Sequence, residues 1–185
     1  MHRLQSLSIK SYGYRCHASA AFDKLTLPAL HELYLPGRFT PNAEPELEPR
    51  GWESLLSLLE RSNCKLQAFK FGHGNIPDLI KNLESPLFEH LTSLQVALNF
   101  YAYSHNIFQL LDALSEVCEE TQRPRMLPLL ETLIFKSLHS EDDVREMVAS
   151  VAAYGGCGKS KLRRVFTQRV EAGENALEMD LKDQE

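Results

Sequence analysis

Apolar residues recur along this chain in a short pattern: an apolar residue, two variable positions, an apolar residue, one variable position and a further apolar residue. Copies of this leucine-rich unit begin at Leu4, Leu30, Leu66, Leu91, Leu130 and Leu162. Only the last copy departs from the pattern, at Thr167. The starts are 26, 36, 25, 39 and 32 residues apart, and repetition at intervals of this length is typical of stacked structural units.

Each unit ends in an alternation of apolar and variable residues, as in Leu33-Tyr34-Leu35. A period of two predicts a β-strand with one buried face, so the variable positions are expected to point outward. The outward pairs are Ser6 and Ser8, Glu32 and Tyr34, Ala68 and Lys70, Ser93 and Gln95, Thr132 and Ile134, and Arg164 and Phe166. This mixed row, with Tyr34, Ile134 and Phe166 exposed, suits a protein ligand better than phosphate or lipid. The alternative is a solvated sheet face with a few chance apolar residues.

Between the units, the apolar spacing changes to that of amphipathic helices. We predict helices over residues 52–61, 76–83, 107–118 and 144–151. The clearest start signals are Asn75 ahead of Pro77, and Ser140 followed by three acidic residues.

Strands that alternate with helices predict an α/β fold with parallel strands and right-handed crossovers. One unit cannot bury its apolar face alone, so we expect a short, irregular leucine-rich-repeat solenoid, with strands on the concave face and helices on the convex face. An ordinary open α/β sheet is the alternative. The array is expected over residues 1–170, and residues 171–185 are expected to be an acidic C-terminal tail or capping helix.

Composition narrows the class of protein. The length of 185 residues suits one domain or one short array, and the net charge of −5 gives no basic excess for nucleic acid. The cysteines have no zinc or redox spacing and predict free thiols in a reducing compartment; they are Cys16, Cys64, Cys118 and Cys157. The sequence offers neither a signal peptide nor a membrane-spanning run, so we expect a cytoplasmic or nuclear protein with no membrane partner.

Residues 153–160, AYGGCGKS, match a relaxed form of the phosphate-loop motif. A phosphate loop needs a strand before it and a helix after it, because N–H groups at the helix start hold the phosphates. Here a predicted helix comes first and the unit at Leu162 follows, so the glycines are expected to form a helix C-cap and turn. A nucleotide-binding enzyme using Lys159 and Ser160 is the less favoured alternative.

Other chemistry is weakly signalled. His73, His105 and His139 follow predicted strands and share one expected rim, but loop histidines are more often plain surface residues than metal ligands. No nucleophile, base and orienting acid stand in a recognisable arrangement. We therefore expect neither catalysis nor a cofactor or metal.

Two predicted loops are candidate binding elements. Residues 36–51 are proline-rich, and a loop of this length is either a binding element or disordered. In residues 99–105, Tyr101, Tyr103 and His105 are candidate partner contacts, since aromatic side chains favour interfaces. The alternative is that Phe100 and Tyr101 close the core beneath the loop.

The segments LTLPALHELYLPG, GWESLLSLLERSNCKLQAFKF and MLPLLETLIFKSL, followed by EDDVREMVASVAAYGG and KLRRVF, resemble leucine-rich-repeat regions of fungal F-box proteins. In that family, strand phrases of the kind LPxLxxLxL alternate with helix-to-strand joints of the kind LLxRSxCxLxxL, which residues 58–66 fit closely. The resemblance covers most of residues 25–170. It implies a substrate-recruiting arm of a cullin-type ubiquitin ligase, which binds a protein and does not catalyse.

The F-box itself, a helical module that docks a Skp-type adaptor, is expected to be absent, because too few residues precede Leu4 to hold one. Residues 127–138 resemble an F-box opening but coincide with a repeat strand, and we interpret them as repeat. The expected partner is a protein, with ubiquitin-ligase subunits added if an F-box lies upstream. A structural fragment with no independent function is the remaining alternative.

Overall fold

The computed structural model describes residues 4–9, 21–35, 49–72, 75–97, 103–120, 123–137, 162, 164–169 and 176–180. The strands are β1 (Ser6–Ser8), β2 (Glu32–Leu35), β3 (Ala68–Phe71), β4 (Ser93–Ala97), β5 (Val117–Cys118), β6 (Arg123–Pro124), β7 (Thr132–Ser137), β8 (Arg164–Arg169) and β9 (Ala176–Asp180). The helices are α2 (Pro49–Ser62), α3 (Ile76–Leu83) and α4 (Tyr103–Ser115), with one 3₁₀ turn, η1 (Pro86–Phe88).

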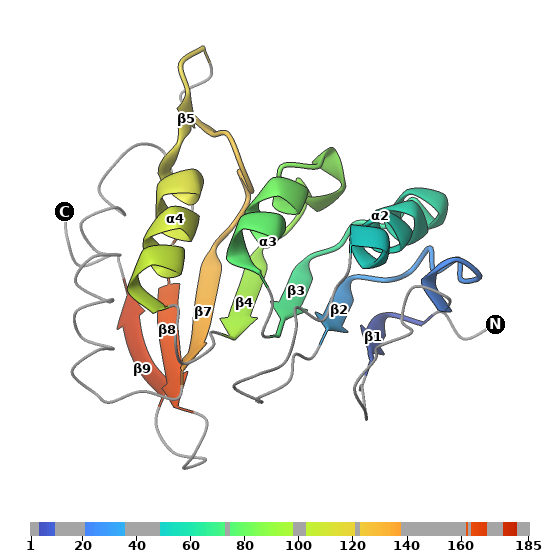
Figure 1. Ribbon diagram of the computed structural model, residues 1–185, viewed down its shortest axis with the longest axis horizontal. Helices are drawn as coiled ribbons and strands as arrows, with labels where there is room; N and C mark the ends of the chain where they lie inside the picture. The colour runs from blue at the N-terminus through green and yellow to red at the C-terminus, as the bar shows by residue number, and fades with distance from the viewer. Residues whose placement is uncertain are drawn as a thin grey trace.

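The main sheet has the strand order β1-β2-β3-β4-β7-β8-β9 (Figure 1). Its first six strands are parallel, and β9 pairs with β8 in the antiparallel direction. The six parallel strands are the six predicted units in chain order. The prediction of an α/β protein with a parallel sheet is therefore confirmed.

The register aligns equivalent positions of the units. The fourth positions lie side by side across the sheet; they are Leu7, Leu33, Phe69, Leu94, Leu133 and Val165. All but Leu7 are completely buried. Because side chains alternate between the two faces of a strand, this alignment places one continuous apolar surface on one side of the sheet.

Four of the five joints between neighbouring parallel strands are made in the same way. The carbonyl oxygen at the second position of a unit accepts two N–H groups from the next unit. His31 accepts from Gln67 and Ala68, at N···O distances of 2.8 and 2.9 Å, and Thr92 accepts from Glu131 and Thr132, at 2.9 and 3.0 Å. Gln5 and Gln67 do the same with the strands that follow them. The unit therefore repeats in backbone hydrogen bonding as well as in sequence.

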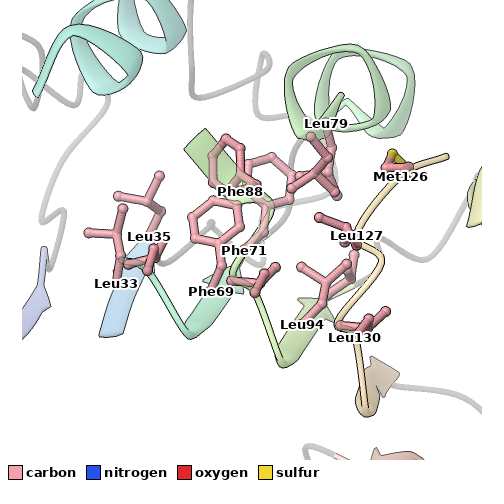
Figure 2. Close-up of a cluster of buried hydrophobic side chains, with 14 of the residues drawn as sticks. Leu33, Leu35, Phe69, Phe71, Leu79, Phe88, Leu94, Met126, Leu127 and Leu130 are labelled. Carbon is pink, nitrogen blue, oxygen red and sulfur yellow. The ribbon is translucent and has the colours of Figure 1, made fainter. Parts of the chain in front are cut away.

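The apolar faces of the helices complete the core. Trp52 of α2 packs on Phe69 and Phe71, with ring centroids 6.4 and 5.6 Å apart. Leu79 of α3 and Leu110 of α4 belong to the same buried cluster as the inward strand residues. Figure 2 shows Leu33, Phe69 and Leu94 on three neighbouring strands, with Leu79 projecting from its helix toward the same layer of side chains. The three helices thus share one face of the sheet, in the order of the strands (Figure 1).

The recurring Leu-Pro phrase before two of the strands forms a tight turn. Leu30 N–H donates to the Leu27 carbonyl at 3.0 Å, and Leu130 N–H donates to the Leu127 carbonyl at 2.9 Å. Leu91 makes the same bond to Phe88 at 3.0 Å without the Leu-Pro phrase. In these three units the turn places the first leucine in the core just before the strand begins.

The helix-to-strand joint of residues 58–66 anchors the segment before β2. Arg61 donates to the carbonyls of Phe22 and Leu25, at 2.5 and 3.2 Å. The buried Ser62 hydroxyl accepts the Leu27 N–H at 2.8 Å. Asn63 ends the helix with a positive φ of 44°, which Asn tolerates better than most residues.

Helix predictions were accurate for α3 and less so elsewhere. Residues 76–83 form α3 as predicted, whereas α2 begins at Pro49, inside the predicted loop, because proline fits the first helical turn. The Asn75 side chain donates to Asp78 at 3.1 Å and makes no capping bond to the backbone.

The prediction of a helix over residues 107–118 was wrong at both ends. Helix α4 starts at Tyr103 and stops at Ser115, and Cys118 lies in the β5–β6 hairpin. The hairpin projects from the end of α4 (Figure 1) and is closed by Arg125 N–H donating to the Glu116 carbonyl at 2.8 Å. Cys118 fits the helical spacing from Leu114, so periodicity alone did not reveal the stop.

The C-terminal prediction of a tail or capping helix was wrong for residues 176–180, which form β9. Leu177 pairs with Thr167, and Met179 pairs with Val165. The alternation of apolar and acidic residues in ALEMD has the period of a strand, and the acidic content concealed it. The acidic segment therefore continues the sheet.

Several predictions fall outside the described residues. They concern the helix over 144–151, the AYGGCGKS stretch, and the loop residues 36–48, 73–74 and 98–102. Across the residues that are described, no helix combines the length and apolar character needed to cross a bilayer.

Candidate protein-binding face

Five residues predicted as partner contacts occupy one line across the sheet. The pairs Tyr34–Lys70, Lys70–Gln95, Gln95–Ile134 and Ile134–Phe166 are all direct register neighbours. We call this line, together with Ser8 at its start, the outer row. Neighbouring strands lie about 4.8 Å apart, so the six positions span roughly 24 Å. The outer row lies on the side opposite the helices, since its residues alternate with the buried ones.

The outer row carries an ion pair that links β2 and β3. The Lys70 ammonium group contacts the carboxylate of Glu32, which lies two residues before Tyr34 and therefore on the same face of the sheet. Tyr34 and Ile134, on either side of the central strands, are partly buried. The row therefore combines a charge pair, an aromatic ring and a branched apolar side chain on one surface, a composition common in protein interfaces.

The pKa of Glu32 is lowered from its ordinary value. The largest cause is the hydrogen bond from Lys70, supported by its positive charge and by a hydrogen bond from Ser6, whereas partial burial acts in the opposite direction. The carboxylate stays ionised at neutral pH, so Ser6, Glu32 and Lys70 form a polar chain across three strands. A group held in its charged form by a lysine suits recognition better than general acid catalysis.

One residue of the outer row is almost completely buried. Gln95 lies in the outer row as predicted, but it is only 7% exposed. It occupies the middle of the sheet, between Lys70 and Ile134 on the two neighbouring strands. Gln95 therefore offers a partner little surface, and the accessible part of the row is concentrated on the strands to either side.

Comparisons with protein-family models, curated proteins and solved structures found no match to this chain.

The predicted rim residues are only partly described. Tyr101 lies outside the described residues, while the backbones of Tyr103 and His105 belong to the first turn of α4. The prediction that residues 103–105 form a loop was therefore wrong. The polar sequence Tyr-Ser-His-Asn gave no apolar stripe to mark the helix start, which lies four residues ahead of Ile107.

Most of the residues considered for other chemistry are not among those that the structure describes. His73, His139, Lys159 and Ser160 lie outside the described residues. In the described part of the chain, no three His, Cys, Asp or Glu side chains cluster in a way that could hold a metal ion. Cys64 is partly buried, and burial raises the pKa of its thiol, which keeps it in the neutral form that packs against the core.

Sequence reasoning missed the Glu32–Lys70 pair although both residues were assigned to the outward face. The available signal was their position, because the third residue of one unit and the fifth of the next carry opposite charges. It also missed the anchoring contacts of Arg61 and Ser62. The sequence motif of residues 58–66 drew attention to these two residues but did not indicate which groups they contact.

Proposed function

We propose that this chain is a non-catalytic protein-binding module, built as a short leucine-rich-repeat solenoid with its strands on the concave face and its helices on the convex face. Support for the solenoid comes from the repeated joint. Four carbonyls at equivalent positions each accept two N–H groups from the next unit, so one geometric step relates successive units.

The observation that carries the binding role is the alignment of Tyr34, Lys70, Ile134 and Phe166 in one line. A solvated sheet face needs no partly buried Tyr and Ile side chains on its outer side, whereas a protein interface uses such residues as anchors. The Glu32–Lys70 pair adds polar groups that fix the orientation of a partner. The resemblance to F-box repeats extends this proposal to recruitment of a substrate protein for ubiquitination.

Site-specific photocrosslinking tests the proposed face. A photoreactive phenylalanine analogue in place of Tyr34 should capture a protein in cells, whereas the same analogue in place of Glu53, exposed on α2, should not capture it. With the captured protein purified, Tyr34→Ala and Ile134→Ala should each weaken binding about tenfold, the loss expected for anchor residues. An unchanged melting temperature in both variants is the control for folding.

Two outcomes contradict the proposal. Capture of the same proteins from positions 34 and 53 would show that crosslinking is non-specific. Unchanged affinity in both alanine variants would place the interface elsewhere. The proposed role in a ubiquitin ligase has a separate test. If it holds, we expect the captured protein to be ubiquitinated faster when this chain is present.

A further inference from the structure

Within the part of the chain that the structure describes, one edge of β1 has no partner strand and some of its apolar residues are exposed. Among the described strands, β1 pairs only with β2. Leu4, at the first position of this unit, is 47% exposed. The equivalent Leu30, Leu66, Leu91 and Leu130 are at most 5% exposed.

The same contrast holds one step further into the unit. Leu7 is partly buried, although the other five residues in its register line are completely buried. Ile9 is partly buried, whereas Leu35 and Phe71 at its position are buried. In the units that begin at Leu30, Leu66, Leu91 and Leu130, the strand of the preceding unit lies beside these positions, whereas no described strand lies on that side of β1.

The backbone of β1 has N–H groups in the positions that pair with a preceding strand in the later units. In later units the N–H groups of the second and third positions donate to the preceding unit, as His31 and Glu32 do to the Gln5 carbonyl at 2.9 and 3.1 Å. The equivalent donors on β1 are Gln5 and Ser6, and no described residue accepts their N–H groups. A strand edge that has unpaired N–H groups and exposed apolar side chains beside it favours the addition of another strand.

We propose that the free edge of β1 is a docking site for a strand unit of the same leucine-rich pattern, supplied by another polypeptide and paired in the parallel direction. All five joints between the parallel strands of this sheet have that geometry, which makes the occupant a continuation of an interface already present. A second copy is disfavoured, because β2, β3, β4, β7, β8 and β9 are already placed in its own main sheet and a symmetric β1–β1 pair would be antiparallel. This inference does not depend on the outer row.

An extended chain tests the proposal. A copy of residues 66–90 replaces residues 1–3, so that the added unit meets Leu4 at the spacing by which Leu66 meets Leu91. The tether gives the added strand a high effective concentration. We expect the amide protons of Gln5 and Ser6 to exchange at least tenfold more slowly than in the unextended chain. The matched control carries Leu66→Ser, Phe69→Ser and Phe71→Ser within the added copy and should give no protection.

A second variant keeps the test decisive. Leu4→Ser in the extended chain should return much of the lost exchange rate, and in the unextended chain it should leave the melting temperature unchanged, because Leu4 is exposed there. Exchange rates of Gln5 and Ser6 within twofold of the unextended chain would overturn the proposal. So would a concentration-dependent dimer of the unextended chain in which these two amides are protected, since a second copy would then be the occupant.

Discussion

At the scale of single residues, the second position of each unit is defined by its backbone. This position holds two glutamines, a histidine and a threonine (Gln5, Gln67, His31 and Thr92), and the carbonyl of each accepts two N–H groups from the next unit. A backbone carbonyl has two lone pairs, so both bonds can form at one oxygen. The side chain at this position can therefore vary from unit to unit. This explains why the repeat is recognised in the sequence from its apolar positions.

The Glu32–Lys70 pair gives a prediction about acidity. The lowered pKa of Glu32 contributes stability above the ordinary glutamate pKa of 4.5, and this contribution is lost as the pH falls through the lowered value. Both side chains are partly exposed, so the contribution is small, about 0.2–1 kcal/mol. Lys70→Met should raise the pKa of Glu32, measured by NMR titration of its side-chain carboxyl carbon.

Lys81→Met, on the exposed side of α3, is the matched control and should leave the titration of Glu32 unchanged. A titration curve of Glu32 that is the same in the Lys70→Met variant and the unmodified chain would contradict the assigned cause of the shift.

At the scale of elements, the strands were readable from sequence because each unit carries its own period and its own buried leucines. Helix α3 was readable because its apolar stripe starts and stops with the helix. The start of α4 was not readable because its first turn is polar, and its end and the following hairpin were not because Cys118 keeps the helical spacing. The strand period of β9 was concealed by its acidic content. The outer row followed from strand parity, whereas the burial of Gln95 depends on side chains from two neighbouring strands.

The joint after α2 is predicted to stabilise the fold through Ser62. Its buried hydroxyl is the acceptor for the Leu27 N–H, which Ser62→Ala would leave unpaired. We expect the free energy of unfolding to fall by about 1–3 kcal/mol, measured by urea denaturation. The same substitution at Ser54, on the same helix, should change it by less than about 0.5 kcal/mol. Equal losses in the two variants would argue against an anchoring role for the joint.

At the scale of the whole molecule, the sheet and three helices share one continuous core from β2 to β8. Four of the six residues at the fourth positions of the units, which lie side by side across the sheet, are leucines. They are Leu7, Leu33, Leu94 and Leu133. Their chemistry is identical, and only their place in the sheet differs. They therefore form a natural series for measuring how support by neighbouring units affects stability.

Leu→Ala at these four positions should give unequal costs. At Leu33, Leu94 and Leu133, which are fully buried, we expect losses of about 2–5 kcal/mol in the free energy of unfolding. At Leu7 the loss should be smaller, because this side chain is partly in solvent before any mutation. Chemical denaturation measures the series. A cost at Leu7 equal to that at Leu94 would mean that β1 is covered in solution.

The antiparallel direction of β9 gives the assembly a polarity. A strand placed beyond β9 could not repeat the two-donor joint of the other units, because the neighbouring backbone runs the opposite way. Further units with the same parallel pairing can therefore be added at the β1 edge of the main sheet and not at the β9 edge. An engineer who wishes to enlarge the protein should graft new units ahead of Leu4 and leave the final strand as a terminator.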